Sequence, residues 1–206
     1  MKRLLVGISF AFISLSATAG GPIGIGELQI GSTKEQVESL PASGGVHLVT
    51  PLAPYVYKHV EPTPGENHFK TTITTPWSRN PLEATLTFSN DILINIYVAL
   101  DDSASMLDQV RSQISDKYGD PNVDDKMEEK QCLYRNGANF KIKSGTIRYS
   151  WLQPMSDGEI IESKVSEGIL DTCPTNLRYG STGAIKVNSL SIGLQKEKAP
   201  SASNPF

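Results

Sequence analysis

The strongest pattern in the chain is an alternation of apolar and polar residues on both sides of Asn90-Asp91. A period of two places every second side chain on the same face of a strand. An Asn-Asp pair between two such runs is typical of a tight β-turn. The sequence therefore predicts a hairpin with one buried face. Its apolar positions are Ala84, Leu86, Phe88, Ile92, Ile94, Ile96, Val98 and Leu100.

Two segments show helical rather than strand patterns. Leu107, Val110, Ile114 and Tyr118 recur at helical spacing, which predicts a helix that begins at residue 102 or 103. Gly119 suits the C-terminal cap of this helix. A shorter helix is expected after Gly31, because Ser32 and Glu35 have the spacing of a capping box and Pro41 ends the run.

Further strands are indicated by β-branched and aromatic residues between turn residues. We expect them at 46–50, 55–60, 69–75, from about 131 onward, at 159–165 and at 184–194. Asn136-Gly137 and Ser144-Gly145 are typical of turns. The apolar phase slips in the last strand, which predicts a β-bulge near Asn188-Ser189.

These elements predict an α+β fold, in which two helices pack on a mainly antiparallel sheet. Their order suggests two α-then-β units in a two-layer sandwich, with halves at 27–101 and 102–194. The glycine-rich residues 20–26 are expected to form a flexible N-terminal arm. Residues 195–206 are expected to be a disordered tail.

The N-terminus has the three parts of a secretory signal peptide. Met1-Lys2-Arg3 is basic, an apolar run follows from Leu4 to about Ser16, and Ala17-Thr18-Ala19 is a small-x-small cleavage site. We expect cleavage after Ala19 and residence in the periplasm or full secretion. No cysteine lies at the cleavage site and no later segment is long and apolar enough to span a bilayer, so membrane insertion is not expected.

Export changes both the charge and the chemistry expected of the cysteines. The full chain has a net charge of −3, and loss of Lys2 and Arg3 leaves 17 basic against 22 acidic residues, a net charge of −5. That balance argues against a nucleic-acid partner. In an oxidising compartment, Cys132 and Cys173 are expected to form a structural disulfide.

No catalytic residue, cofactor motif or nucleophile elbow is recognisable in the sequence. Several groups of residues are candidates for interaction instead. Trp77 lies between proline-flanked turns and is the aromatic residue we most expect to be exposed. Other aromatic residues could line a groove or belong to the core: Tyr55, Tyr57, Tyr97, Tyr149 and Trp151. A solvated acidic connection could dock a basic partner: Asp120, Asp124, Asp125, Glu128 and Glu129.

Histidines suggest one alternative chemistry. If residues 55–60 and 68–75 formed a symmetric hairpin, His59 would stand opposite His68, and with His47 these imidazoles could bind zinc or copper. The histidines lack the H-x-H or H-x-x-x-H spacing of metal sites. Exposed polar residues at the base of a loop are the competing interpretation.

The stretch Gly31-Ser32-Thr33-Lys34-Glu35-Gln36-Val37 resembles the start of the small envelope domain in the SmpA/OmlA outer-membrane assembly lipoproteins. In outline the expected tandem of helix and sheet also looks similar to domains of the β-lactamase-inhibitor-protein type. This resemblance implies a two-layer α+β fold that binds other proteins without catalysis. The chain departs from the lipoproteins because it lacks a lipid-attachment cysteine.

The function that the sequence favours is an exported, soluble protein-binding module of the bacterial envelope. One version is an inhibitor or immunity-type protein that uses residues 120–129 against a basic effector. A metal-assisted hydrolase that uses the three histidines and an envelope assembly factor are the alternatives. The expected partner is another protein of unknown identity.

Overall fold

The fold is dominated by one antiparallel sheet of nine strands, as described by a computed structural model. The structure describes residues 20–58, 63–134, 136–173 and 184–195. Strands hold 54% and helices 12% of it. The α+β sandwich of two helices on a sheet is therefore wrong, and the protein is mostly β. Residues 139–154 and 160–170, which include serine, lysine and other polar residues, form two long strands, because neighbouring strands satisfy their backbone groups.

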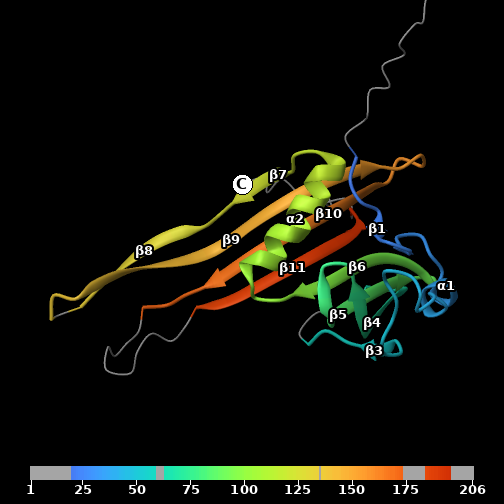
Figure 1. Cartoon of the computed structure of the whole chain (residues 1–206), viewed down its shortest axis with the longest axis horizontal. Coiled ribbons are helices and arrows are strands. Elements are labelled where there is room, and N and C mark those ends of the chain that lie inside the picture. Colours follow the sequence, from blue (N-terminus) through green and yellow to red (C-terminus); the bar gives the residue numbers. More distant parts are fainter. Residues whose placement is uncertain (1–19, 59–62, 135, 174–183, 196–206) are drawn as a thin grey trace, which may run out of the picture.

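The sheet has the strand order β3-β4-β5-β6-β11-β10-β9-β7, and β8 pairs with β9 outside this path. Its strands are β3 (Ala53–Tyr55), β4 (Glu66–Thr75), β5 (Ser78–Ser89), β6 (Ile92–Leu100), β7 (Asn122–Asp125), β8 (Glu128–Leu133), β9 (Asn139–Pro154), β10 (Ile160–Leu170) and β11 (Ile185–Leu194). The pair β6–β11 joins the strands of the N-terminal half to those of the C-terminal half. In Figure 1 the helix α2 (Ala104–Tyr118) lies along the long strands β9–β11, and α1 (Lys34–Glu38) lies beside β4–β6.

The hairpin and the longer helix predicted from periodicity are both present, but the buried face predicted for the hairpin is wrong at the start of its second strand. Leu93 is buried there, whereas Ile92 is exposed and Ile94 is only partly buried, because a bulge shifts the register between Thr87 and Phe88. The hairpin β5–β6 turns at Asn90 and Asp91, whose positive φ angles of 48° and 62° fit a two-residue turn. The helix α2 is capped by Ser103, whose side chain accepts a hydrogen bond from the amide of Met106, and it ends at Gly119. Leu107 and Val110 are its buried residues.

The first helix begins one residue later than expected. Thr33, not Ser32, is the N-cap, and it forms the capping box with Gln36 rather than with Glu35. The helix covers only Lys34–Glu38 and buries Val37. The strand expected at 46–50 is reduced to a single bridge between Leu48 and Ile73.

Two local predictions in the second half are wrong. Ser144-Gly145 is not a turn, because β9 continues through it and changes partner there, from β8 to β7 and β10. No bulge interrupts β11 near Asn188-Ser189. Asn188 occupies a buried position, and its side-chain amide donates to the carbonyl of Asp101. The strand therefore alternates regularly between its two faces, with a polar residue at a buried position where the sequence pattern led us to expect an apolar one.

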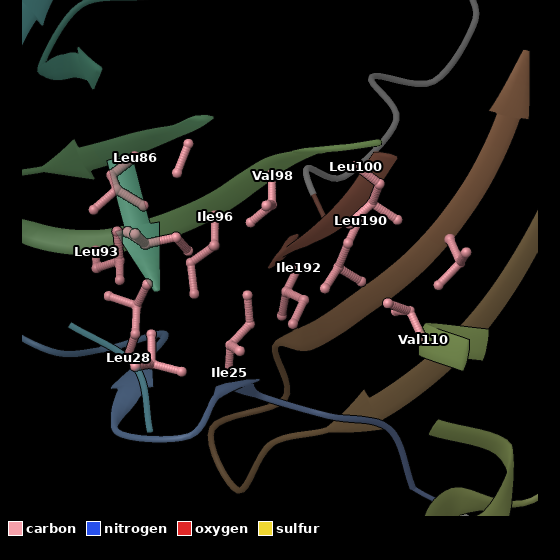
Figure 2. Close-up of a cluster of buried hydrophobic side chains, with 14 of the residues drawn as sticks. Ile25, Leu28, Leu86, Leu93, Ile96, Val98, Leu100, Val110, Leu190 and Ile192 are labelled. Atoms are coloured by element: carbon pink, nitrogen blue, oxygen red, sulfur yellow. The ribbon is translucent and has the colours of Figure 1, made fainter. Parts of the chain in front are cut away.

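One face of the sheet carries the hydrophobic core. Figure 2 shows Ile96 and Val98 of β6 beside Leu190 and Ile192 of β11, in one cluster that continues to Val110 of α2. The short strands β1 (Gly24–Ile25) and β2 (Leu28–Gln29) add Ile25 and Leu28 to the same cluster. Both helices and the N-terminal segment therefore lie against the same face of the sheet.

The N-terminal segment 20–26, expected to be a flexible arm, is held by specific contacts. The amide of Gly21 donates to Oε1 of Gln153 at 3.1 Å. The hydroxyl of Ser163 is fully buried and donates to the carbonyl of Pro22 at 2.6 Å. Residues 1–19 and 196–206, which contain the expected signal peptide and most of the expected tail, lie outside the described residues, as does His59.

The expected disulfide is confirmed and fixes a projecting ribbon. The strand β8 pairs with residues 139–144 of β9 and extends the sheet in Figure 1. Cys132 in β8 is bonded to Cys173, which follows β10. Cys132 is buried whereas the other residues of β8 are exposed, and the disulfide ties this strand to the chain that follows β10.

Candidate functional site

The sheet face opposite the core is not covered by either helix. The register places residues of six strands side by side across this face, and we call it the open face. Lys70, Thr85 and Tyr97 are cross-strand neighbours on β4, β5 and β6. The same row continues through Ser191 on β11 and Lys164 on β10.

A pocket of about 720 Å³ is hollowed in the open face over β3–β6. Its volume lies within the range of about 300–1,000 Å³ that is usual for ligand sites. The segment 50–57 forms one wall, and β4, β5 and β6 supply the remaining side chains. We call it the tyrosine pocket, because three of its residues are Tyr55, Tyr57 and Tyr97. The other lining residues are Thr50, Pro51, Leu52, Ala53, Lys70, Thr71, Thr72, Glu83, Ala84, Thr85 and Ala99.

Tyr57 is fixed in the pocket wall by ring contacts. Its ring lies edge-on to that of Tyr55, with centroids 4.9 Å apart, and to that of His68, with centroids 5.0 Å apart. His68 is itself held by Thr87, because its Nδ1 lies 2.9 Å from Oγ1 of that residue. Burial and the neighbouring phenols of Tyr55 and Tyr97 raise the pKa of Tyr57, against a lowering effect of the Thr85 hydroxyl.

Two charged side chains, Lys70 and Glu83, face the same pocket. The ammonium of Lys70 lies 4.2 Å from the centre of the Tyr55 ring, a cation–π contact. Within the described ranges, no histidine or cysteine lines the pocket. Aromatic walls, hydroxyl groups and two charges suit the binding of a ligand.

His47 and His68 lie far apart, and His59, which the hairpin hypothesis placed opposite His68, lies outside the described residues. Tyr55 stands opposite His68 in the register of β3 and β4. His47 contacts Thr74, near the other end of β4, with its Nδ1 3.0 Å from Oγ1. Six strand residues separate Thr74 from His68, about 20 Å. Among the described residues, no three of the His, Cys, Asp and Glu side chains form a group that could hold a metal ion.

The predicted acidic connection is largely built into two strands. Asp124 forms ion pairs with Lys126 at 3.1 Å and with Arg148 at 3.5 Å. Glu129 pairs with Lys141 at 2.9 Å, and this hydrogen-bonded ammonium lowers the pKa of the Glu129 carboxyl. Neighbouring cations therefore offset much of the acidity.

The remaining acidic residues of this group are also exposed. Asp125 accepts a hydrogen bond from the amide of Met127, and Asp120 and Glu128 lie at the surface. Their use against a basic partner stays a prediction.

Trp77 is not the exposed residue that the sequence suggested. It is partly buried, packs against the core, and its indole N–H is buried without a hydrogen-bond partner in the described part of the chain. Trp151 is also a core residue, and its indole donates to the carbonyl of Gly119 at 2.8 Å. Of the six aromatic residues considered for a groove, Tyr55, Tyr57 and Tyr97 line one.

Small and apolar residues complete the open face beyond the pocket. The register places Ser189, Ser191 and Gly193 of β11 in its centre. Towards the ends of β10 and β11 the same face carries Leu170 and the exposed side chains of Ile185 and Val187. The face thus has two apolar regions separated by small side chains.

Comparison with family models, with curated proteins and with solved structures gave no match for this chain. Neither helix in the described part of the chain has the length and hydrophobicity needed to cross a membrane. The disulfide fits an oxidising compartment outside the cytoplasm.

Proposed function

We propose that the mature chain is an exported protein-binding module that binds its partner through the open face of the sheet. The observation that carries this proposal is the tyrosine pocket, which opens on a sheet face that no described helix covers. Tyrosine is enriched at protein interfaces, because its large ring can be buried while the hydroxyl group finds a hydrogen-bond partner. A partner side chain in the pocket would be an interface anchor.

The centre of the open face supports the same function. Ser189 and Ser191 project little from β11, so another protein surface can approach the backbone closely between the pocket and the apolar residues Ile185 and Val187. The resemblance of residues 31–37 to envelope assembly domains points to the same class of function. An inhibitor or immunity-type protein is one form that such a module could take.

Export is part of this proposal, and it rests on the signal-like residues 1–19 together with the disulfide. Expression of the full chain in a Gram-negative host is expected to yield a periplasmic product whose intact mass corresponds to a start at Gly20. An uncleaved product that stays in the cytoplasm would contradict export.

The binding face can be tested by photo-crosslinking in the cells that produce the protein. A photoreactive residue at Ser191, on the open face, is expected to give a discrete adduct that disappears when Tyr57→Ala is added. The matched control places the same residue at Gln113, which is exposed on α2. Adducts from position 113 alone, or an adduct from position 191 that is unaffected by Tyr57→Ala, would contradict the proposal.

A further inference from the structure

Most charged side chains on the open face are already paired within the chain. Lys164 lies 2.9 Å from Glu162, two residues along the same strand β10. Arg148 of β9 pairs with Asp124 of the neighbouring strand β7 at 3.5 Å. These charges offer little to a partner, because their own neighbours offset them.

Lys70 and Glu83 differ from these residues. Both are exposed and both line the tyrosine pocket, yet neither forms an ion pair with a described residue. Lys70 stands directly opposite Thr85 in the register, and Glu83 lies two residues from Thr85 on the same face. Diagonal neighbours of this kind are about 7–8 Å apart. A cation whose contact is with the Tyr55 ring and an anion without an ion pair in the described ranges therefore stand near each other at one pocket.

The interior of the pocket has a different character from these two charges. Its walls include the rings of Tyr55, Tyr57 and Tyr97 and the side chains of Leu52 and Ala99. A volume of about 720 Å³ is large enough for an aromatic side chain and part of the backbone that carries it. The lining therefore matches an apolar group that has one charge of each sign beside it.

We infer that the tyrosine pocket takes a segment of a partner protein in which one aromatic side chain is flanked by an acidic and a basic residue. The acidic residue pairs with Lys70 and the basic residue pairs with Glu83. This inference rests on the proposed protein-binding function and adds the chemistry of the segment that is bound. The aromatic ring supplies the buried anchor, whereas the two charges fix the direction of the segment.

Capped tripeptides test the inference on the mature protein. The probes are Ac-Glu-Trp-Lys-NH2 and Ac-Lys-Trp-Glu-NH2, their single glutamine replacements, and neutral Ac-Gln-Trp-Gln-NH2. Binding is measured from amide chemical shifts of the pocket residues. In whichever of the two charged peptides binds more tightly, each charge is expected to tighten binding about two- to fivefold relative to its glutamine replacement. That gain shrinks in high salt.

Variants of the protein assign each gain to its residue. Lys70→Gln should abolish the gain from the peptide's glutamate and leave that from its lysine, and Glu83→Gln should do the reverse. Lys164→Gln, on the same face but already paired with Glu162, is the matched control and should change neither gain. The thermal midpoint of each variant shows that it is folded.

Four results would overturn the inference. If the neutral peptide binds as tightly as the charged ones, or if no peptide shifts the pocket signals, the charged segment is wrong, whereas crosslinking through Ser191 still decides the proposed function. If the gains survive in Lys70→Gln and Glu83→Gln, other groups provide them. If free tryptophan binds more tightly than every peptide, the pocket takes a small zwitterion and not a protein segment.

Discussion

At the scale of single residues, Tyr57 connects the pocket to a measurable property. Its pKa is raised because burial and the nearby phenols of Tyr55 and Tyr97 disfavour the phenolate. The neutral phenol is the form that the folded state favours. Any stability that this provides is fully present below pH 10, the ordinary phenol pKa, and is lost as the pH rises through the raised value.

We therefore expect Tyr57 to ionise above pH 10 in the folded protein. The difference between the absorbance titrations at 295 nm of the wild type and Tyr57→Phe isolates this group. Thr85→Val should move the midpoint higher still, because the Thr85 hydroxyl stabilises the phenolate. A difference curve centred at or below pH 10 would show that Tyr57 is not held in the pocket wall beside Tyr55 and Tyr97 as described.

Another single residue explains why part of β9 escaped prediction. Gly145 follows a serine, and such pairs are typical of turns. The structure places it inside β9 with φ at +136°, where an added Cβ would collide with the carbonyl of Lys126. A glycine that permits close approach of two backbones cannot be told from a turn glycine until the neighbouring strand is known.

Replacement of Gly145 by alanine is expected to destabilise the protein by about 3 kcal/mol or more, since strain at positive φ and a backbone clash add together. The matched control is Gly158→Ala. That glycine also has a positive φ, of +90°, but open space surrounds its added Cβ, so a loss of about 1–2 kcal/mol is expected. Urea denaturation followed by circular dichroism measures both. Equal losses would contradict the close approach at Gly145.

At the scale of elements, the sequence is most informative where the residues that specify a helix or hairpin all lie within that one segment. The hairpin β5–β6 and the helix α2 follow from local periodicity and turn chemistry. The pocket does not, because Tyr55, Lys70 and Tyr97 meet only through the register of four strands. The mistaken bulge at Asn188 has the same origin, since its partner Asp101 lies 87 residues away.

The β8–β9 ribbon depends on one bond that local patterns could not position. The disulfide between Cys132 and Cys173 closes a loop of 41 residues, worth about 4 kcal/mol in the chain-entropy estimate. In the Cys132→Ser/Cys173→Ser variant, we expect trypsin to cut on the order of tenfold faster at Lys130, Lys141 and Lys143 under native conditions, because the ribbon opens locally.

Mass spectrometry of the fragments identifies these cuts. Trypsin sites outside the ribbon, such as Lys164 in β10, serve as the internal control and should stay protected. Faster cleavage at Lys164 to the same extent would show that the disulfide stabilises the whole fold and not the ribbon in particular.

At the scale of the whole molecule, the pairing of β6 with β11, which we call the central seam, couples the unfolding of the two halves. Ile96 pairs with Ile192 and Val98 with Leu190 across β6 and β11, and all four side chains are almost fully buried. If either half of the chain unfolded alone, it would expose its two side chains of this cluster, Ile96 and Val98 or Leu190 and Ile192. Burial of apolar side chains is worth about 1.5–3 kcal/mol for each residue, so the seam penalises separate unfolding.

We therefore expect one cooperative transition for the two halves, which the two tryptophans can report separately. Trp77 lies in the N-terminal half and Trp151 in the C-terminal half. In Trp151→Phe the remaining Trp77 fluorescence should change with urea at the same midpoint as the far-UV circular dichroism, and in Trp77→Phe the Trp151 fluorescence should do the same. Ile192→Ala opens a cavity at the seam and should lower the free energy of unfolding by about 2–5 kcal/mol. Both urea midpoints should fall together. Fluorescence that precedes the circular dichroism change in either variant would show that the seam does not couple the halves.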